Sequence, residues 1–534
     1  MHPLLRTIPI FIAILTLTGC NQNRPQRPPQ DPHIQAYFNN SIFSQYKEPY
    51  RHKTRAGDNL EQHIIDAIKS AKISIDIAVQ ELRLPNIAHA LAQRQKEGIK
   101  IRIILENTYN HPFSEITSSQ LAKLDPREQK RYQELHLLAD KNLDQKLSNQ
   151  EINESDSILI LKNAKIPIID DTADGSKGTG LMHHKFIIVD NTNLIVTSAN
   201  FTTSDIHGDF SSPETRGNLN NLLIIKSPEL AQLFTEEFNI MWGDGPAGQA
   251  DSKFGIKKTL RPPRSLEIGN NIVTLQFSPS SRTQPWEQSV NGLIGKILAD
   301  ASQSIDLALF VFSEQQLSNI LETKTSQGVK LRTLIEPTFA YRNYSEALDI
   351  LGVTLTNEKC QIEPENKPWK NPITTVGVPQ LPQGDLLHHK FGIIDSKTVI
   401  TGSHNWSIAA NNTNDETLLV IQNPTLTAHF IKEYEKIYNH ANLGLPTFLS
   451  KKIKLSQQKC NELLTKNSQN TQQLINLNTA TQKQLETLPG VGPKLAQQII
   501  IARQQKPFTS LQDLDQVPGV GPKLLEKIQH QVTW

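Results

Sequence analysis

Two stretches of the sequence place a histidine two residues before a lysine, and each is followed by a short apolar run. The first contains His183, Lys185 and Asp190, and Asn200 follows it. The second repeats these residue types at the same spacing: His388, Lys390, Asp395 and Asn405. In an extended strand, residues two apart point to the same face, so each histidine projects beside its lysine. One imidazole can attack phosphorus and a second can protonate the leaving oxygen, while lysine and asparagine side chains stabilise the developing charge. The pattern therefore predicts cleavage of a phosphodiester bond without a metal ion.

The doubled order His-x-Lys-x4-Asp followed by Ser-x-Asn resembles the signature of the phospholipase D superfamily. The resemblance implies one active site that receives a motif from each half of the chain, a phosphohistidine intermediate, and no catalytic cofactor, metal or nucleotide. It also implies an acidic residue that orients a catalytic histidine; Glu416 matches it in the second half, whereas Asn220 stands at that position in the first. Because an amide fixes a tautomer but does not stabilise an imidazolium, we predict that His183 is the nucleophile and that His388, supported by Glu416, is the general acid. The exchange of these two roles is the alternative.

The elements that must position the motifs are duplicated as well. Strand-like segments at 73–79 and 99–105 surround a helical pattern, and the same order returns at 304–309 and 329–335. Such repeats predict an α/β fold, with mixed sheets flanked by helices in each half. We expect the halves to face each other across a pseudo-twofold axis with one active site between them. Since both motifs lie in one chain, we expect a monomer.

The first half also contains an insertion, residues 125–163, that the second half lacks. Its residues 140–151 resemble an EF-hand calcium loop. The predicted ligand positions are Asp140, Asn142, Asp144, Lys146 (through its carbonyl), Ser148 and Glu151. Gln145 departs from the glycine that such a loop prefers at its position of positive φ. We expect a structural calcium ion here; a polar helix–loop–helix without an ion is the alternative.

The N-terminus has the pattern of an export signal. Arg6 precedes an apolar run at 8–17, and Leu-Thr-Gly ahead of Cys20 resembles a bacterial lipobox. We predict that Cys20 is lipidated and that the protein is anchored to a membrane, facing the periplasm or the cell exterior. A plain signal peptide or a short membrane anchor is the alternative.

The composition is that of an ordinary globular chain, with 37% hydrophobic and 20% charged residues among 534. The net charge of +2 is so small that any nucleic-acid-binding surface must be local. Three cysteines exclude a disulfide-rich scaffold, and whether Cys360 and Cys460 pair is left open.

The C-terminal segment contains a second duplication. Leu-Pro-Gly-Val-Gly-Pro-Lys at 488–494 returns as Val-Pro-Gly-Val-Gly-Pro-Lys at 517–523, between helical patterns. This resembles the tandem helix-hairpin-helix domains of competence-type DNA-binding proteins. The resemblance implies backbone contacts to DNA phosphates from Gly490, Gly492, Lys494, Gly519, Gly521 and Lys523. Such binding is independent of sequence and sensitive to salt.

The predicted organisation is a sequence of seven segments. They are a signal peptide at 1–20, a Pro/Gln-rich linker at 21–35, the first half at 36–246, a linker at 247–272, the second half at 273–445, a linker at 446–473 and a small all-α helix-hairpin-helix domain at 474–534.

The motifs alone are compatible with cleavage of nucleic acid or of a phospholipid. The C-terminal domain favours a non-specific DNA nuclease, because it would concentrate DNA at the active site. A phospholipase D that hydrolyses phosphatidylcholine-type lipids is the alternative, and a non-catalytic DNA-binding lipoprotein is a second one.

Overall fold

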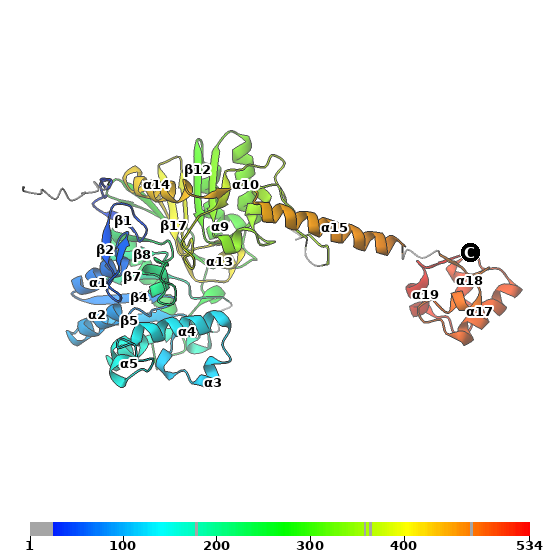
Figure 1. Ribbon diagram of the computed structural model, residues 1–534, viewed down its shortest axis with the longest axis horizontal. Coiled ribbons are helices and arrows are strands. Elements are labelled where there is room, and N and C mark those ends of the chain that lie inside the picture. The colour runs from blue at the N-terminus through cyan, green and yellow to red at the C-terminus, as the bar shows by residue number, and fades with distance from the viewer. Residues whose placement is uncertain (1–24, 177–179, 357–358, 363–365, 470–473) are drawn as a thin grey trace, which may run out of the picture. The chain divides into compact units, whose positions relative to one another are not determined.

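The computed structural model describes residues 25–176, 180–356, 359–362, 366–469 and 474–534. They form two compact units: residues up to 354 with 362–446, and residues 355–361 with 447–534 (Figure 1). The predicted signal peptide and Cys20 lie outside the described residues. In the part of the chain that is described, no helix is long and apolar enough to cross a bilayer.

The first half of unit 1 is built on a mixed sheet. Its strands, in spatial order, are β1 (Ile34–Phe38), β9 (Asn221–Lys226), β8 (Asn193–Thr197), β7 (Lys185–Val189), β4 (Ser74–Val79), β5 (Lys100–Leu105) and β6 (Ile168–Asp170). The last three strands run parallel to one another, and the other pairings are antiparallel. The helices of this half are α1 (Leu60–Ser70), α2 (Pro85–Lys96), α7 (Thr203–Ile206) and α8 (Pro228–Trp242), and a hairpin joins β2 (Gln45–Lys47) to β3 (Thr54–Ala56).

The second half repeats this order and adds a strand at each edge. Its strands are β10 (Arg264–Ile268), β11 (Asn271–Ser278), β19 (Glu416–Gln422), β17 (Thr398–Gly402), β16 (Lys390–Ile394), β12 (Ser304–Leu309), β14 (Lys330–Ile335), β15 (Val376–Val378) and β20 (Asn442–Leu443). Its helices are α9 (Val290–Ala299), α10 (Gln315–Ser326), α11 (Pro337–Ala340), α12 (Glu346–Ile350), α13 (Ile408–Asn412) and α14 (Pro424–Tyr438), and β13 (Phe312–Ser313) pairs with β18 (Trp406–Ser407). The prediction of duplicated α/β halves with mixed sheets is confirmed.

The duplication extends to individual side chains. In β4 and β5, Asp76 accepts two hydrogen bonds from Arg102, whose guanidinium covers an aromatic ring of α8. In β12 and β14, Asp306 and Arg332 form the same pair over a ring of α14. Matching helices also begin alike: α8 and α14 each have proline at the first position after a capping side chain. Equivalent residues therefore build equivalent elements in both halves.

The two halves share one hydrophobic core. Phe186 and Phe234 of the first half and Phe277, Phe391 and Phe430 of the second belong to the same buried cluster. One face of each sheet is therefore buried in a core to which both halves contribute.

The predicted linker at 247–272 is part of this body. Phe254 is buried, and the buried amino group of Lys258 pairs with the carboxylates of Glu237 and Asp415. The same stretch also contains β10. The linker prediction is therefore wrong here: a polar, basic stretch is held inside by the two acidic partners that it neutralises.

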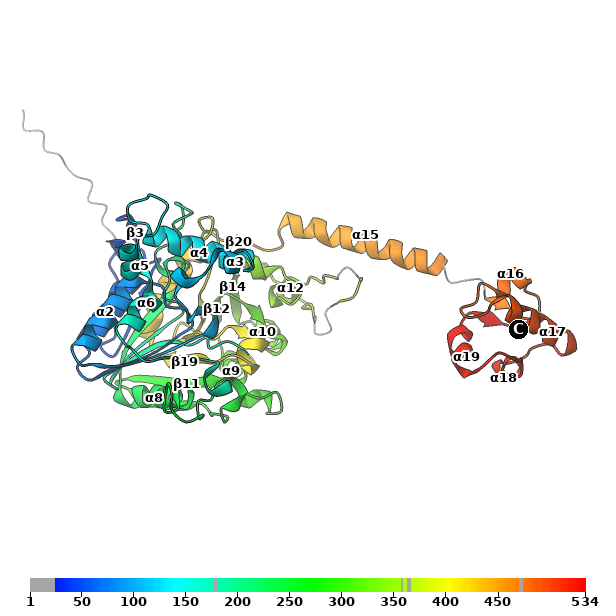
Figure 2. The ribbon, with the colours of Figure 1, turned by 90° about the horizontal axis from the view of Figure 1, so that it is seen from below.

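The insertion folds as three helices at one side of unit 1, and a fourth, short helix directly precedes it. They are α3 (Ser118–Leu121), α4 (Pro126–Ala139), α5 (Asn149–Ser155) and α6 (Ser157–Asn163), and α6 packs against α2. In Figure 2, α4 and α5 lie on the side of unit 1 opposite α8.

Unit 2 contains the C-terminal duplication. A long helix, α15 (Thr447–Gln469), occupies most of the segment predicted as a linker, and Cys460 on it forms a disulfide with Cys360. The domain that follows contains α16 (Gln482–Leu485), α17 (Pro493–Gln505), α18 (Leu511–Asp515) and α19 (Pro522–Ile528). It is not purely helical, because β21 (Ile475–Asn476) pairs with β22 (Val532–Thr533).

Candidate active site

The two histidine motifs meet at the junction between the halves. Each histidine lies just before its strand, His183 before β7 and His388 before β16. The backbone N–H of His183 donates to the carbonyl of Asp415, next to the start of β19 (3.0 Å). The N–H of Asp415 in turn donates to the carbonyl of Leu181 (2.9 Å), and the equivalent bond in the other motif runs from the N–H of Leu219 to the carbonyl of Leu386 (2.8 Å). Each motif is therefore held by backbone bonds to the opposite half, and both histidines line one cleft.

The side-chain partners of the histidines also come from the opposite half. Nδ1 of His183 lies 2.7 Å from Oε2 of Glu416, and Nδ1 of His388 lies 2.9 Å from Oδ1 of Asn220. The prediction that Glu416 supports His388 is therefore wrong. That prediction assumed that each acceptor binds the histidine of its own half. In the structure, each acceptor lies across the pseudo-twofold axis and binds the histidine of the other half.

These contacts define which imidazole nitrogen carries the proton. The amide nitrogen of Asn220 donates to the carbonyls of Asp205 and Asn218, so its oxygen faces His388. The Nδ1 atom of His388 must then donate, which leaves Nε2 with a free lone pair. The carboxylate of Glu416 imposes the same tautomer on His183.

Burial and the neighbouring lysines favour neutral histidines. Burial, followed by the charges of Lys185 and Lys390, holds the pKa of His183 well below that of free imidazole, and the same causes lower the pKa of His388. Burial also raises the pKa of Glu416, an effect opposed by the Lys185 charge. A neutral imidazole with a bare Nε2 is the form that can attack phosphorus.

The lysines and asparagines of the motifs surround the histidine pair. The ammonium group of Lys185 donates to the carbonyl of His183 (2.9 Å), and that of Lys390 donates to the carbonyl of His388 (2.6 Å). Asn200 and Asn405 line the same cleft as the histidines. The structure thus brings together the predicted His, Lys and Asn residues and Glu416.

The two aspartates of the motifs do not lie in the cleft. Asp190 follows the far end of β7, where its carboxylate accepts backbone N–H groups of residues 72–74. Asp395 follows β16 and does the same for residues 302–304. Each strand of five residues separates aspartate from lysine by about 17 Å. We therefore correct their role from catalytic to structural: they hold the loop that enters the neighbouring strand.

A carboxylate that the sequence did not reveal stands beside His388. Oδ1 of Asp205 lies 3.8 Å from Nδ1 of His388 and accepts a hydrogen bond from Asn218 (2.6 Å), and Oδ2 accepts the backbone N–H of Asn200 (2.7 Å). Asp205 is buried. In the sequence it follows Thr202 at the spacing of a helix cap, so it is read as a local capping residue.

The cleft has a volume of about 470 Å³ and one wall from the insertion. Arg127, Lys130 and Arg131 of α4 line it together with the histidines. Lys130 pairs with Asp209 (2.9 Å), and Arg131 pairs with Glu128 (2.9 Å). The spacing of these cations, three and four residues apart, places them on one helical face and could have been recognised in the sequence.

The predicted calcium loop has the expected backbone conformation, but two of its carboxylates accept hydrogen bonds from backbone N–H groups of the loop itself. It joins α4 to α5, and Gln145 adopts the positive φ of 65° that the loop requires at this position. The carboxylate of Asp140 accepts the N–H groups of Asp144 and Gln145, and that of Glu151 accepts those of Lys141 and Ser148. Across the described ranges, no group of three or more His, Cys, Asp or Glu side chains is placed to hold a metal ion. Calcium binding stays a prediction.

The two hairpins of unit 2 have the geometry expected of phosphate-binding turns. Gly490 and Gly519 have φ values of 91° and 97°, which other residues rarely adopt. Gly492 and Gly521 directly precede α17 and α19, and a Cβ added to either would meet no neighbouring atom. Lys494 and Lys523 are exposed beside them. The turn backbone is therefore open to a ligand.

Comparison with known families agrees with this architecture. The sequence matches the family described as "Cardiolipin synthase, PLD-like domain" over residues 64–242 and 294–438, and a helix-hairpin-helix motif family over residues 470–533. The chain belongs to the phospholipase D-like family.

The names of similar proteins refer to cardiolipin hydrolase and to phospholipase D. Mitochondrial cardiolipin hydrolase of Homo sapiens is 28% identical over 166 residues, which are 31% of this chain and 57% of that protein. Phospholipase D of Rickettsia typhi is 24% identical over 137 residues, 26% of this chain and 57% of that protein. The chain thus spans little more than half the length of these relatives.

Two solved structures complete the comparison. Phosphatidylserine synthase of Haemophilus influenzae is 12% identical, with a TM-score of 0.48, over 79% of this chain and 89% of that chain. Nuc of Salmonella typhimurium, a phospholipase D family member, is 21% identical, with a TM-score of 0.24, over 40% of this chain and 97% of that chain.

Proposed function

We propose that this protein is a metal-independent DNA nuclease without sequence specificity, anchored to a bacterial membrane by a lipid on Cys20 and active as a monomer. Family membership supports phosphodiester hydrolysis. The observation that favours DNA is the pair of open glycine turns flanked by Lys494 and Lys523. Backbone N–H groups at such turns grip phosphates irrespective of base sequence.

The proposed reaction uses the two histidines in turn. Nε2 of His183 attacks phosphorus, and the positive charge that develops on its ring is stabilised by Glu416 at 2.7 Å. His388 donates a proton to the departing oxygen; the negative charge of the bound phosphodiester and the nearby Asp205 favour its protonated form. Water then attacks the phosphohistidine, with His388 accepting its proton, and releases His183. The nucleophile stays as predicted, but the reason has changed, because the carboxylate stabilises the attacking histidine.

Phospholipid hydrolysis is the second candidate. The observation that favours it is the set of relatives whose names refer to cardiolipin or phospholipase D, each matched over only part of its length. The catalytic steps would be the same, with a lipid phosphodiester in place of DNA. A DNA-binding lipoprotein without catalysis is the third.

The deciding experiment uses the chain without residues 1–20 in excess EDTA. It is incubated with plasmid DNA and, separately, with phosphatidylcholine vesicles, beside His183→Ala and His388→Ala variants. We expect plasmid nicking that both substitutions abolish and that weakens as salt rises. Choline release with intact plasmid would instead identify a phospholipase, and DNA binding without cleavage would identify the lipoprotein.

A further inference from the structure

The long helix α15 of unit 2 exposes a group of lysines that the proposed reaction does not use. Of its 23 residues, one is acidic, Glu462. Its exposed lysines are Lys451, Lys452, Lys454 and Lys459. Across the described residues, none of these four ammonium groups forms an ion pair with a carboxylate. A solvated linker does not need such an excess of one charge, because like charges three residues apart destabilise a helix.

The other side of α15 is held by a short segment of the chain. Residues at the spacing of one helical face are buried or half-buried, namely Leu449, Ile453, Ser456 and Cys460. Cys460 forms the disulfide with Cys360, and Oγ of Ser456 lies 2.6 Å from Oγ1 of Thr356. The segment 355–361 therefore fixes one face of α15, and the lysines lie on the remaining surface, which is exposed to solvent.

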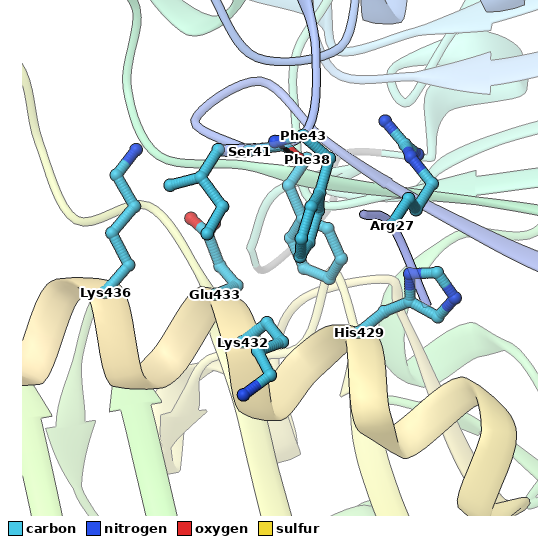
Figure 3. A pocket seen from close by; sticks show the side chains of 9 residues that line it. Arg27, Phe38, Ser41, Phe43, His429, Lys432, Glu433 and Lys436 are labelled. Carbon is cyan, nitrogen blue, oxygen red and sulfur yellow. Dashed lines mark hydrogen bonds between the residues drawn. The ribbon is translucent and has the colours of Figure 1, made fainter. Parts of the chain in front are cut away.

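The cations beside α14 in unit 1 differ from these lysines. In Figure 3, Lys432 and Lys436 lie along α14, and Arg27, from a segment predicted as a linker, lines the same surface hollow. These three cations are bound, in this order, to the side chains of Glu435, Asn40 and Asp58. The predicted linker at 21–35 is therefore fixed to unit 1 from Arg27 onward. The lysines of α15 have no such partner in the part of the chain that the structure describes.

The arrangement on α15 favours a phosphate backbone over a bilayer as the ligand. A helix that lies in a membrane interface inserts a continuous apolar face. The apolar stripe of α15 is already buried or half-buried. Phe448 and Leu455 are exposed, but the positions one turn from Leu455 include Lys451, Lys452 and Lys459 rather than apolar residues.

The spacing of the lysines also suits a regular row of phosphates. From residue 451 to residue 459 the helix rises about 12 Å, a length over which one DNA strand presents about four phosphates. Lysine binds a phosphate as a point charge, so it does not read the base.

We propose that the exposed face of α15 is a further DNA-binding element of this protein, at which Lys451, Lys452, Lys454 and Lys459 bind backbone phosphates without regard to base sequence. The inference deepens the proposed nuclease function and rests on it, since it takes the same polymer as the ligand. It assigns part of the affinity to a helix outside the two hairpins.

The test measures how the affinity for a fluorescein-labelled DNA duplex depends on salt. The chain lacks residues 1–20 and carries His183→Ala, so that cleavage does not interfere. The test variant combines Lys451→Gln, Lys452→Gln, Lys454→Gln and Lys459→Gln. Glutamine has nearly the helix propensity of lysine, so α15 should persist. The slope of log affinity against log salt should become shallower by about 2 to 4, because each lost phosphate contact removes about 0.9.

A matched control removes the same charge from unit 1. It replaces exposed lysines that do not line the cleft, by Lys69→Gln, Lys96→Gln, Lys100→Gln and Lys162→Gln. We expect it to keep the slope of the parent. Equal slopes in the control and the test variant would overturn the proposal. A third chain with arginine at the four α15 positions retains the charge and should also keep the parent slope; a loss that arginine does not restore would mean that the substitutions disturb the fold of α15, against the proposal.

The same chains are also sedimented with phosphatidylglycerol vesicles. If the glutamine variant lost vesicle binding and kept its DNA slope, the ligand of α15 would be a bilayer and the proposal would be wrong. A parent that binds no duplex would overturn this inference together with the proposed action on DNA. A parent that binds and nicks DNA, with an unchanged slope in the glutamine variant, would overturn the inference alone.

Discussion

Replacing Glu416 by glutamine tests the reasoning about the nucleophile most directly. In the parent, Oε1 of Glu416 accepts a hydrogen bond from Asn414 (3.3 Å) and Oε2 faces Nδ1 of His183 (2.7 Å). A glutamine keeps its oxygen at Asn414, so its NH₂ group faces His183. Nδ1 must then accept, the ring proton moves to Nε2, and the attacking lone pair is lost.

The expected loss in the rate of the chemical step follows from two contributions. Losing a charge-assisted bond of about 1.5–3 kcal/mol corresponds to a factor of about 10 to 150, and the wrong tautomer enlarges the loss to about 10³–10⁴. Rapid-quench, single-turnover cleavage of an end-labelled oligonucleotide measures it. Glu433→Gln is the matched control, since it makes the same change beside His389, a buried histidine that does not line the cleft, and should leave the rate within a few-fold. A folded Glu416→Gln enzyme with nearly the parent rate would refute the assignment of Glu416 to His183.

Four further predictions test neighbouring parts of the argument. Burial lowers the pKa of Lys185 to about 8 from the usual lysine value, so the affinity of the His388→Ala variant for an oligonucleotide should fall as pH rises through about 8, where the cation is lost; an affinity that is constant to pH 10 would contradict this. Asp205→Asn should reduce kcat about tenfold, because His388 loses the carboxylate that favours its protonated form, and the loss should shrink as pH falls; a loss that is independent of pH would indicate a merely structural role. Asp190→Ala should lower the free energy of unfolding by about 2 kcal/mol in denaturant titrations while the folded enzyme keeps its activity; lost activity at full stability would reinstate a catalytic role. Excess calcium should raise Tm by a few degrees in the parent and not in Glu151→Gln, and an unchanged parent Tm would remove calcium from the loop.

The fold and the catalytic pair were predictable because they depend on residue types at short, repeated spacing. His183 and Lys185 precede an apolar strand, and the repeat at His388 places a second copy in the same structural context. What failed depends on long-range pairing. Glu416 reaches His183 only because β19 begins beside the opposite motif, and no local pattern encodes which strand ends meet.

The misread linkers have a related cause. The stretch around Lys258 looks solvated because it is basic and contains proline, yet buried carboxylates far away in sequence neutralise it. Arg27 behaves likewise through Asp58. The composition of a segment indicates how well it is solvated by water. It does not indicate whether residues elsewhere in the chain pair with its charges.

Each catalytic histidine is paired with an acceptor from the opposite half. This crossed pairing suggests an advantage of having both halves in a single chain. A symmetric dimer of identical halves would give both histidines the same acceptor, because one gene would encode both. Once the two copies are joined, Glu416 and Asn220 can differ, and each change alters the histidine of the other copy. Gene fusion thus permits a division of labour: one imidazole can be tuned for attack and the other for proton donation. It also makes the copies interdependent, since either one expressed alone as a monomer would have a histidine without its acceptor.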